Sequence, residues 1–224
     1  MVCMVASLGC GSQKGETLDA SPVADSAGDL DAAGCQPKML LVGGTDIAPQ
    51  GWTTVMLAPA QVTYGTDYVH LQTSTTTGAR MGGQLLLDYP GALDVGKPFK
   101  LQVVMLVESV NPHNLLDSAA AILGSFTPPG GTTNERDQII YLDSAKIGWA
   151  DDTQSFAVSI VNNAYHTYEL SVDAGSVAHV SVDGVPALTR NGFVSNGAIA
   201  IGDQTNDPNV DSALRIRSVT KLCP

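Results

Sequence analysis

Apolar and polar residues alternate along residues 167–172, and the same alternation returns along residues 177–182. Successive side chains of a β-strand point to opposite faces, so each stretch has one apolar face and one polar face. Residues 174–176 form a short loop between them, and Asp183-Gly184 is a strong hairpin signal that leads into the next stretch. The pattern predicts neighbouring antiparallel strands that are half buried.

Similar short stretches recur between residues 38 and 221, separated by turn signals such as Pro90-Gly91 and Asn162-Asn163. Short strands at regular spacing, without helical patterns between them, predict an all-β sandwich or barrel. Residues 100–107 are apolar on both faces, which predicts a central strand covered on both sides. Residues 111–123 contain helix-tolerant alanines, but we interpret them as a loop followed by a strand.

The composition of the chain supports the all-β prediction, and its charge excludes one class of binding partner. The chain is 44% hydrophobic, which is enough for a substantial core, and glutamate and lysine are scarce. Its formal net charge is −11, so nucleic acid is excluded as a partner. No run of 18 apolar residues is present, which excludes a membrane-spanning helix within this sequence.

Residues 1–10 are predicted to be the remnant of a lipoprotein signal peptide. Residues 7–10 resemble a bacterial lipobox, in which Cys10 would receive the lipid after cleavage. The usual leucine is replaced by Ser7, and a start codon upstream of Met1 would supply the missing front half of the signal. Gly11 follows the cysteine where an inner-membrane signal usually has aspartate, which indicates the outer membrane. The alternative is an ordinary N-terminus without fixed structure.

Two further segments follow. Residues 11–34 contain alanine, serine, glycine and aspartate with few bulky side chains, which predicts a flexible acidic tether. Residues 35–224 form the predicted folded domain, bracketed by Cys35 and Cys223. Cysteines at the two ends of an exported domain predict a disulfide, with buried free thiols as the alternative.

Residues 167–221 resemble the C-terminal part of the concanavalin A-like lectin and glucanase superfamily, including its laminin-G-like group. The resemblance rests on Val180-Ser181-Val182-Asp183-Gly184, on Ile201-Gly202-Asp203 and on a last strand from Leu214 to Lys221. It implies two antiparallel sheets in a jelly-roll sandwich. It also implies that both ends of the domain lie together on one sheet, where a disulfide can join them.

The resemblance also defines what an enzyme of this superfamily needs. Its glycoside hydrolases carry paired glutamates spaced as Glu-x-Asp-x-Glu, whereas Glu108, Glu135 and Glu169 have no acidic neighbour at that spacing. We therefore predict no catalytic activity, and no second carboxylate facing Glu108 across an open groove. A polysaccharide lyase would need a histidine and a tyrosine in one groove, and no spacing links the candidates His70, His166, His179, Tyr141 and Tyr168.

Two groups of residues are candidates for ligand binding. Aspartate and asparagine side chains are calcium ligands, and they cluster at Asp203, Asn206, Asp207, Asn209 and Asp211. The same residue types also favour turns that need no ion, and we prefer that interpretation. Aromatic rings suit the apolar faces of sugars, and the candidates are Trp149, Trp52 and Tyr141. Core packing is the alternative for both tryptophans, and Trp149 is the one expected to be exposed.

Together these features predict a secreted or outer-membrane lipoprotein with a non-catalytic, lectin-like domain. Its role would be recognition, with carbohydrate or an envelope protein as partner, or a structural role in the cell envelope. We expect no cofactor, with calcium as the one candidate. The alternatives are a glycoside hydrolase or polysaccharide lyase with an unrecognised site, and a protein–protein interaction domain.

Overall fold

The computed structural model describes residues 35–74, 83–115, 117–124, 138–207 and 209–224. These residues contain fifteen β-strands, and the one helical element among them is a 3-10 turn at Ala48–Gln50. The all-β prediction is therefore confirmed. Within this part of the chain, no helix has both the length and the apolar character needed to cross a bilayer.

The larger sheet, sheet A, has eight strands. Seven follow the order β13-β12-β11-β6-β15-β4-β3, and β1 pairs with β15 beside β4. Its strands are β1 (Lys38–Val42), β3 (Gln61–Tyr64), β4 (Val69–Gln72), β6 (Phe99–Val110), β11 (His166–Val172), β12 (Val177–Val182), β13 (Val185–Asn191) and β15 (Ser212–Leu222).

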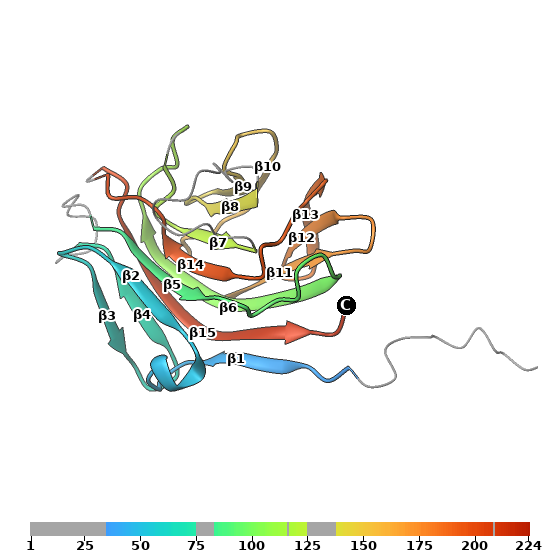
Figure 1. The fold of residues 1–224 in the computed structure, drawn as a ribbon. Coiled ribbons are helices and arrows are strands. Elements are labelled where there is room, and N and C mark those ends of the chain that lie inside the picture. The colour runs from blue at the N-terminus through green and yellow to red at the C-terminus, as the bar shows by residue number, and fades with distance from the viewer. Residues whose placement is uncertain (1–34, 75–82, 116, 125–137, 208) are drawn as a thin grey trace, which may run out of the picture. The chain divides into compact units, whose positions relative to one another are not determined.

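The smaller sheet, sheet B, has seven strands in the order β10-β9-β8-β7-β14-β5-β2, and all pairings in both sheets are antiparallel. Figure 1 shows β7, β8, β9 and β14 of sheet B above β6 and β15 of sheet A, as in a jelly-roll sandwich. Its strands are β2 (Thr53–Met56), β5 (Leu85–Tyr89), β7 (Ala121–Leu123), β8 (Ile139–Leu142), β9 (Lys146–Trp149), β10 (Ser155–Ala157) and β14 (Ile199–Asp203).

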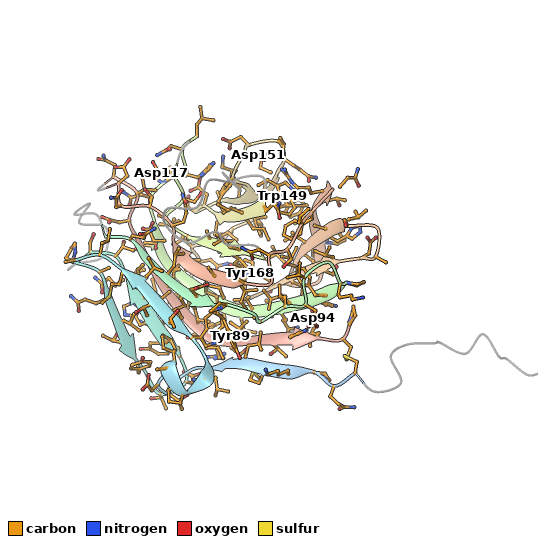
Figure 2. The ribbon with its side chains drawn as sticks, viewed as in Figure 1. Tyr89, Asp94, Asp117, Trp149, Asp151 and Tyr168 are labelled. Atoms are coloured by element: carbon orange, nitrogen blue, oxygen red, sulfur yellow. A yellow bond between two sulfur atoms is a disulfide. The ribbon has the colours of Figure 1, made fainter. Side chains whose placement is uncertain are left out.

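The core lies between the inner faces of the two sheets, and the predicted alternation supplies it. In β11 the apolar residues Tyr168, Leu170 and Val172 are buried, whereas the residues between them are partly exposed. Tyr168 lies between the layers in Figure 2. Burial of a leucine or valine side chain contributes about 1.5–3 kcal/mol, so rows of such residues hold the layers together.

Two local predictions can be checked against this core. Residues 111–123 form no helix in their described part and end in the strand β7, as predicted. The prediction that residues 100–107 are covered on both faces is wrong for most of the strand. Lys100, Gln102 and Val104 are partly exposed on the outer face of sheet A, and burial on both faces begins near Met105.

The two ends of the domain meet on sheet A, as the resemblance implied. Strand β1 pairs with β15, and Cys35 and Cys223 form a disulfide across a sequence separation of 188 residues. This confirms the predicted pairing. Closing so long a loop stabilises the folded state by about 5 kcal/mol in the chain-entropy account. Cys10 and the predicted tether lie outside the described residues.

The outer face of sheet B, which points away from the core, is a second apolar layer. Its strands have apolar residues at successive positions, so both of their faces are apolar. The buried side chains of this layer are Leu86, Ala121, Leu123, Ile139, Tyr141, Ala150, Ala198 and Ala200.

Candidate functional site

One end of sheet B gathers polar residues from two loops, and His113 of the first loop contacts Asp152 of a third loop, which follows β9 at the opposite end of β8. Antiparallel pairing places Gly202 of β14, Ala121 of β7 and Tyr141 of β8 in one row, so the loops beside them share that end. We call these polar side chains the loop-end cluster. Its members are His113, Asn114, Asp117, Asp152, Asp203, Thr205, Asp207 and Asn209.

His113 fixes the loop before β7 onto the outer face of sheet B. Its ring stacks on Tyr141 with 3.9 Å between centroids and 9° between planes. Nδ1 lies 2.9 Å from the carbonyl oxygen of Asp117, and Nε2 lies 3.1 Å from Oδ1 of Asp152. The side chain is 3% exposed, so it acts as a fixed support between its own loop, strand β8 and the loop of Asp152. No pattern in the sequence pointed to His113.

Ser118, His113 and Asp152 form a hydrogen-bonded chain that resembles a hydrolase triad in composition. Ser118 Oγ lies 2.9 Å from Nδ1 of His113. Nδ1 also faces the carbonyl oxygen of Asp117, which can only accept a hydrogen bond, so Nδ1 carries a proton and cannot take the serine proton. Ser118 is 1% exposed, which leaves its hydroxyl out of reach of a substrate. The chain supports the loop.

Asp203 at the end of β14 is the most perturbed acid of the cluster. It is 1% exposed, and its Oδ1 accepts a hydrogen bond of 2.9 Å from the backbone N–H of Thr205. Burial, followed by the negative charges of Asp211, Asp117 and Asp207, raises the pKa of Asp203 to about 9. Asp203 is therefore protonated at neutral pH.

The predicted calcium ligands form a hydrogen-bonded turn. Asp207 Oδ1 accepts hydrogen bonds from the backbone N–H and from Nδ2 of Asn209, at 2.8 and 2.9 Å. Asp211 Oδ1 accepts one from the Thr73 hydroxyl at 3.3 Å, and Asn206 is exposed. In the described part of the chain, no three His, Cys, Asp or Glu residues are grouped so that they could hold a metal ion. The residues as they lie do not fit calcium.

The three aromatic residues proposed for sugar stacking are buried. Trp52 is 2% exposed, Trp149 is 0% exposed and Tyr141 is 1% exposed, so the prediction that Trp149 is exposed is wrong. Side chains alternate between the two faces of β9, so Trp149 points to the opposite face from Gly148 and Ala150. That face is the one that lines the core.

Two contacts cover or anchor these rings. The Arg190 guanidinium lies 4.7 Å from the Trp149 ring and is held by Asp151, labelled near Trp149 in Figure 2. Trp52 Nε1 donates a 2.7 Å hydrogen bond to the carbonyl oxygen of Leu40. Both tryptophans therefore stabilise the fold, and neither offers a ring to a sugar.

Glu108, the one glutamate considered as a catalytic acid, lies on the outer face of sheet A. Its Oε2 is 2.7 Å from Nε2 of His70, and its Oε1 pairs with Arg215. The Arg215 guanidinium in turn lies 4.7 Å from the Tyr68 ring. Both carboxylate oxygens therefore contact basic side chains of neighbouring strands, an arrangement typical of a structural network.

No protein-family model and no curated protein sequence matches this chain. Solved structures do match. A carbohydrate esterase from the Shiga toxin-encoding bacteriophage phi24B has a TM-score of 0.53 at 14% identity, over 84% of this chain and 100% of that one. The exoplasmic/lumenal domain of VIP36, in its Ca²⁺/Man-bound form, has a TM-score of 0.52 at 12% identity, over 78% and 83%.

The cellulose-induced protein Cip1 has a TM-score of 0.52 at 8% identity, over 82% of this chain and 97% of that one. Identities this low establish the fold alone. They confirm the two-sheet, concanavalin A-like jelly-roll sandwich that residues 167–221 indicated.

Proposed function

We propose that the protein is a non-catalytic, lectin-like module that binds carbohydrate through its loop-end cluster. The observation that carries this proposal is a group of exposed, planar polar side chains around the His113–Tyr141 stack. Asn114, Asp152 and Asn209 are exposed and belong to three different loops. Sugar hydroxyls both donate and accept hydrogen bonds, so amide and carboxylate groups placed side by side suit them.

The cluster is held in place before any ligand arrives, which lowers the ordering cost of binding. Asp117 accepts a 2.6 Å hydrogen bond from the Thr205 hydroxyl, which joins the loops before β7 and after β14. Asp152 has φ 59°, a left-handed conformation that is uncommon for aspartate. Backbone strain of this kind persists where the surroundings enforce it, often at binding sites.

We propose that binding does not require calcium. One carboxylate oxygen in each of Asp117, Asp203 and Asp207 already accepts a hydrogen bond from a neighbouring N–H or O–H group. A cation would also have to displace the proton held by Asp203. Removal of calcium with EDTA should therefore leave the affinity for sugar unchanged within about twofold.

The proposal is tested by titration calorimetry with oligosaccharides of mannose, glucose and N-acetylglucosamine. The double variant Asn114→Ala/Asn209→Ala should bind about tenfold more weakly, equivalent to about 1.4 kcal/mol. Asn191→Ala is the matched control, since Asn191 is an exposed asparagine at the end of β13 in sheet A. Equal affinity of the wild type and the double variant would show that the loop-end cluster is not the carbohydrate-binding site.

The rival is an ester or glycoside hydrolase of the same fold. Ser118→Ala removes the hydroxyl nearest to His113, and Glu108→Gln removes the candidate acid. We propose that the wild type releases neither acetate nor reducing sugar from acetylated or plain β-glucans. Turnover that either substitution abolishes would establish an enzyme instead.

We also propose that the protein is exported and attached to the outer membrane through Cys10, with residues 11–34 as a tether to the domain. The Cys35–Cys223 disulfide supports an oxidising compartment. A full-length precursor with its native upstream start should partition into detergent, and Cys10→Ala should release it into the aqueous phase. Equal partitioning of the two forms would contradict the anchor.

A further inference from the structure

A groove follows the β11–β12 hairpin, away from the loop-end cluster. It consists of three neighbouring depressions of about 180, 310 and 70 Å³. Ser171 lines both the first and the second, and Asp173 and Ala174 line both the second and the third. We call it the hairpin groove. The largest depression reaches the lower end of the range of about 300–1,000 Å³ that is common for ligand sites.

The first depression lies on the outer face of sheet A, and its lining combines polar and apolar side chains. Lys100 Nζ lies 3.1 Å from Glu169 Oε2, and Gln102 donates a 3.0 Å hydrogen bond to Oε1 of the same residue. These contacts fix the walls of the depression. Within the part of the chain that the structure describes, the lining residues Ser171, His179 and Ser181 have no side-chain partner. Their donors and acceptors are therefore available to a ligand.

The second depression is apolar and is bounded by a rigid turn. Pro98, Val172, Ala174 and Pro224 supply its apolar surface. Asp173 Oδ1 accepts hydrogen bonds from the backbone N–H groups of Gly175 and Val177, at 2.8 and 2.9 Å. The groove is thus preformed, which favours binding because little order has to be gained.

The charge and the topology of the groove decide between classes of ligand. Lys97 and Lys100 balance Glu169 and Asp173 among its lining residues, so it is formally neutral on a chain of net charge −11. A neutral groove selects neither anions nor cations. Strands β11 and β12 are paired on both sides, so an extended peptide cannot add to them as a further strand.

We propose that the hairpin groove is a second binding site, for an extended and neutral oligosaccharide. Mixed polar and apolar surface matches a sugar chain, whose rings have apolar faces and hydroxyl edges. The site lies on sheet A and is independent of the loop-end cluster on sheet B. A molecule with both sites can hold two chains, or two parts of one chain, with increased avidity.

The test is NMR of the full, ¹⁵N-labelled chain titrated with chitohexaose, cellohexaose and maltohexaose. At least one of these should shift the His179 ring signals together with the amide signals of Ser171 and Ala174. Ser171→Trp fills the junction of the first two depressions and should weaken that binding at least tenfold. Thr63→Trp, at an exposed position on β3 of the same sheet, is the control and should leave it unchanged.

Two further measurements keep the proposal falsifiable. The double variant His179→Ala/Ser181→Ala removes polar groups without added bulk and should weaken binding at least threefold, with an unchanged thermal midpoint. In Asn114→Ala/Asn209→Ala the signals at His179 should still shift, whether or not the loop-end cluster binds sugar.

Four results would overturn the proposal. They are shifts confined to His113 and its neighbours, shifts at His179 that disappear in the loop-end double variant, no shift with any hexasaccharide, and stronger shifts with trigalacturonate or an octapeptide than with the neutral sugars. The first of these leaves the proposed function at the loop-end cluster intact, so failures of the two proposals are distinguishable.

Discussion

The outer faces of the two sheets differ, although their inner faces build one shared core. On sheet A many of the outer side chains are polar, and several pair across strands, as Lys100 does with Glu169 and Arg215 with Glu108. On sheet B they are apolar and buried, as Leu86 and Ala200 are. The outer face of sheet A can therefore be exposed to solvent, whereas the outer face of sheet B has to be covered by other residues. The stacking of His113 on Tyr141 is one such cover, and the loop-end cluster lies where the cover meets solvent.

The largest expected effect comes from placing a charge on the covered face. Ala200 is 0% exposed and lies between Leu123 and Asp88 in the register of sheet B. Ala200→Glu should therefore lower the free energy of unfolding by about 4 kcal/mol, because a buried charge next to a carboxylate has no partner. Urea unfolding followed by tryptophan fluorescence measures it.

The matched control is Thr189→Glu on the outer face of sheet A, where the side chain is exposed. It should change the free energy of unfolding by no more than about 0.5 kcal/mol. Similar losses in the two variants would show that the outer faces are equivalent, and the contrast between the sheets would be lost.

The next effect concerns the proton on Asp203. The pKa of Asp203 is about 9 in the folded protein, against 3.8 for an unperturbed carboxyl. The folded state therefore holds the proton more tightly, and stability should fall as pH rises from about 4 towards 9. Asp203→Asn should flatten this dependence, giving a variant that matches the wild type near pH 4 and exceeds it near pH 8.

Thermal unfolding from pH 4 to pH 9 measures the dependence, with Asp173→Asn as the control on an exposed turn. Added calcium should not raise the midpoint of the wild type. A midpoint that rises with calcium at pH 8, and not in Asp203→Asn, would mean that the cluster binds the ion after all.

The smallest effect is expected on the outer face of sheet A. Glu108→Gln removes the charge that pairs with His70 and Arg215, and should cost about 1 kcal/mol, because all three side chains are partly exposed. Asp67→Asn removes a more exposed pair with Arg217 and should cost less. A loss above about 3 kcal/mol for Glu108→Gln would show a network that is buried rather than solvated.

The sequence predicted what depends on local patterns. The alternation in residues 167–182 and the hairpin signal Asp183-Gly184 became β11, β12 and β13, with the register that the turn allows. The cysteines at the domain ends met because β1 and β15 are neighbours. The direction of the Trp149 side chain was predicted wrongly, although Trp149 lies on the same face of β9 as Ile147, two positions earlier.

The remaining features depend on contacts between distant residues. His113 reaches Asp152 across 39 positions, and Glu108 reaches His70 across 38. Such pairs follow from sheet order and from the path of loops, which no periodicity encodes. The buried carboxyl of Asp203 is similar, because one of its neighbours, Asp117, comes from the loop before β7.

The most direct test of the central claim is a glycan array probed with the purified domain, residues 35–224, beside its Asn114→Ala/Asn209→Ala variant. The account predicts that the wild type binds a defined set of glycans equally with calcium and with EDTA, and that the variant loses those signals about tenfold. Carbohydrate recognition at the loop-end cluster would be contradicted if the wild type bound no glycan, or if the two proteins gave equal signals.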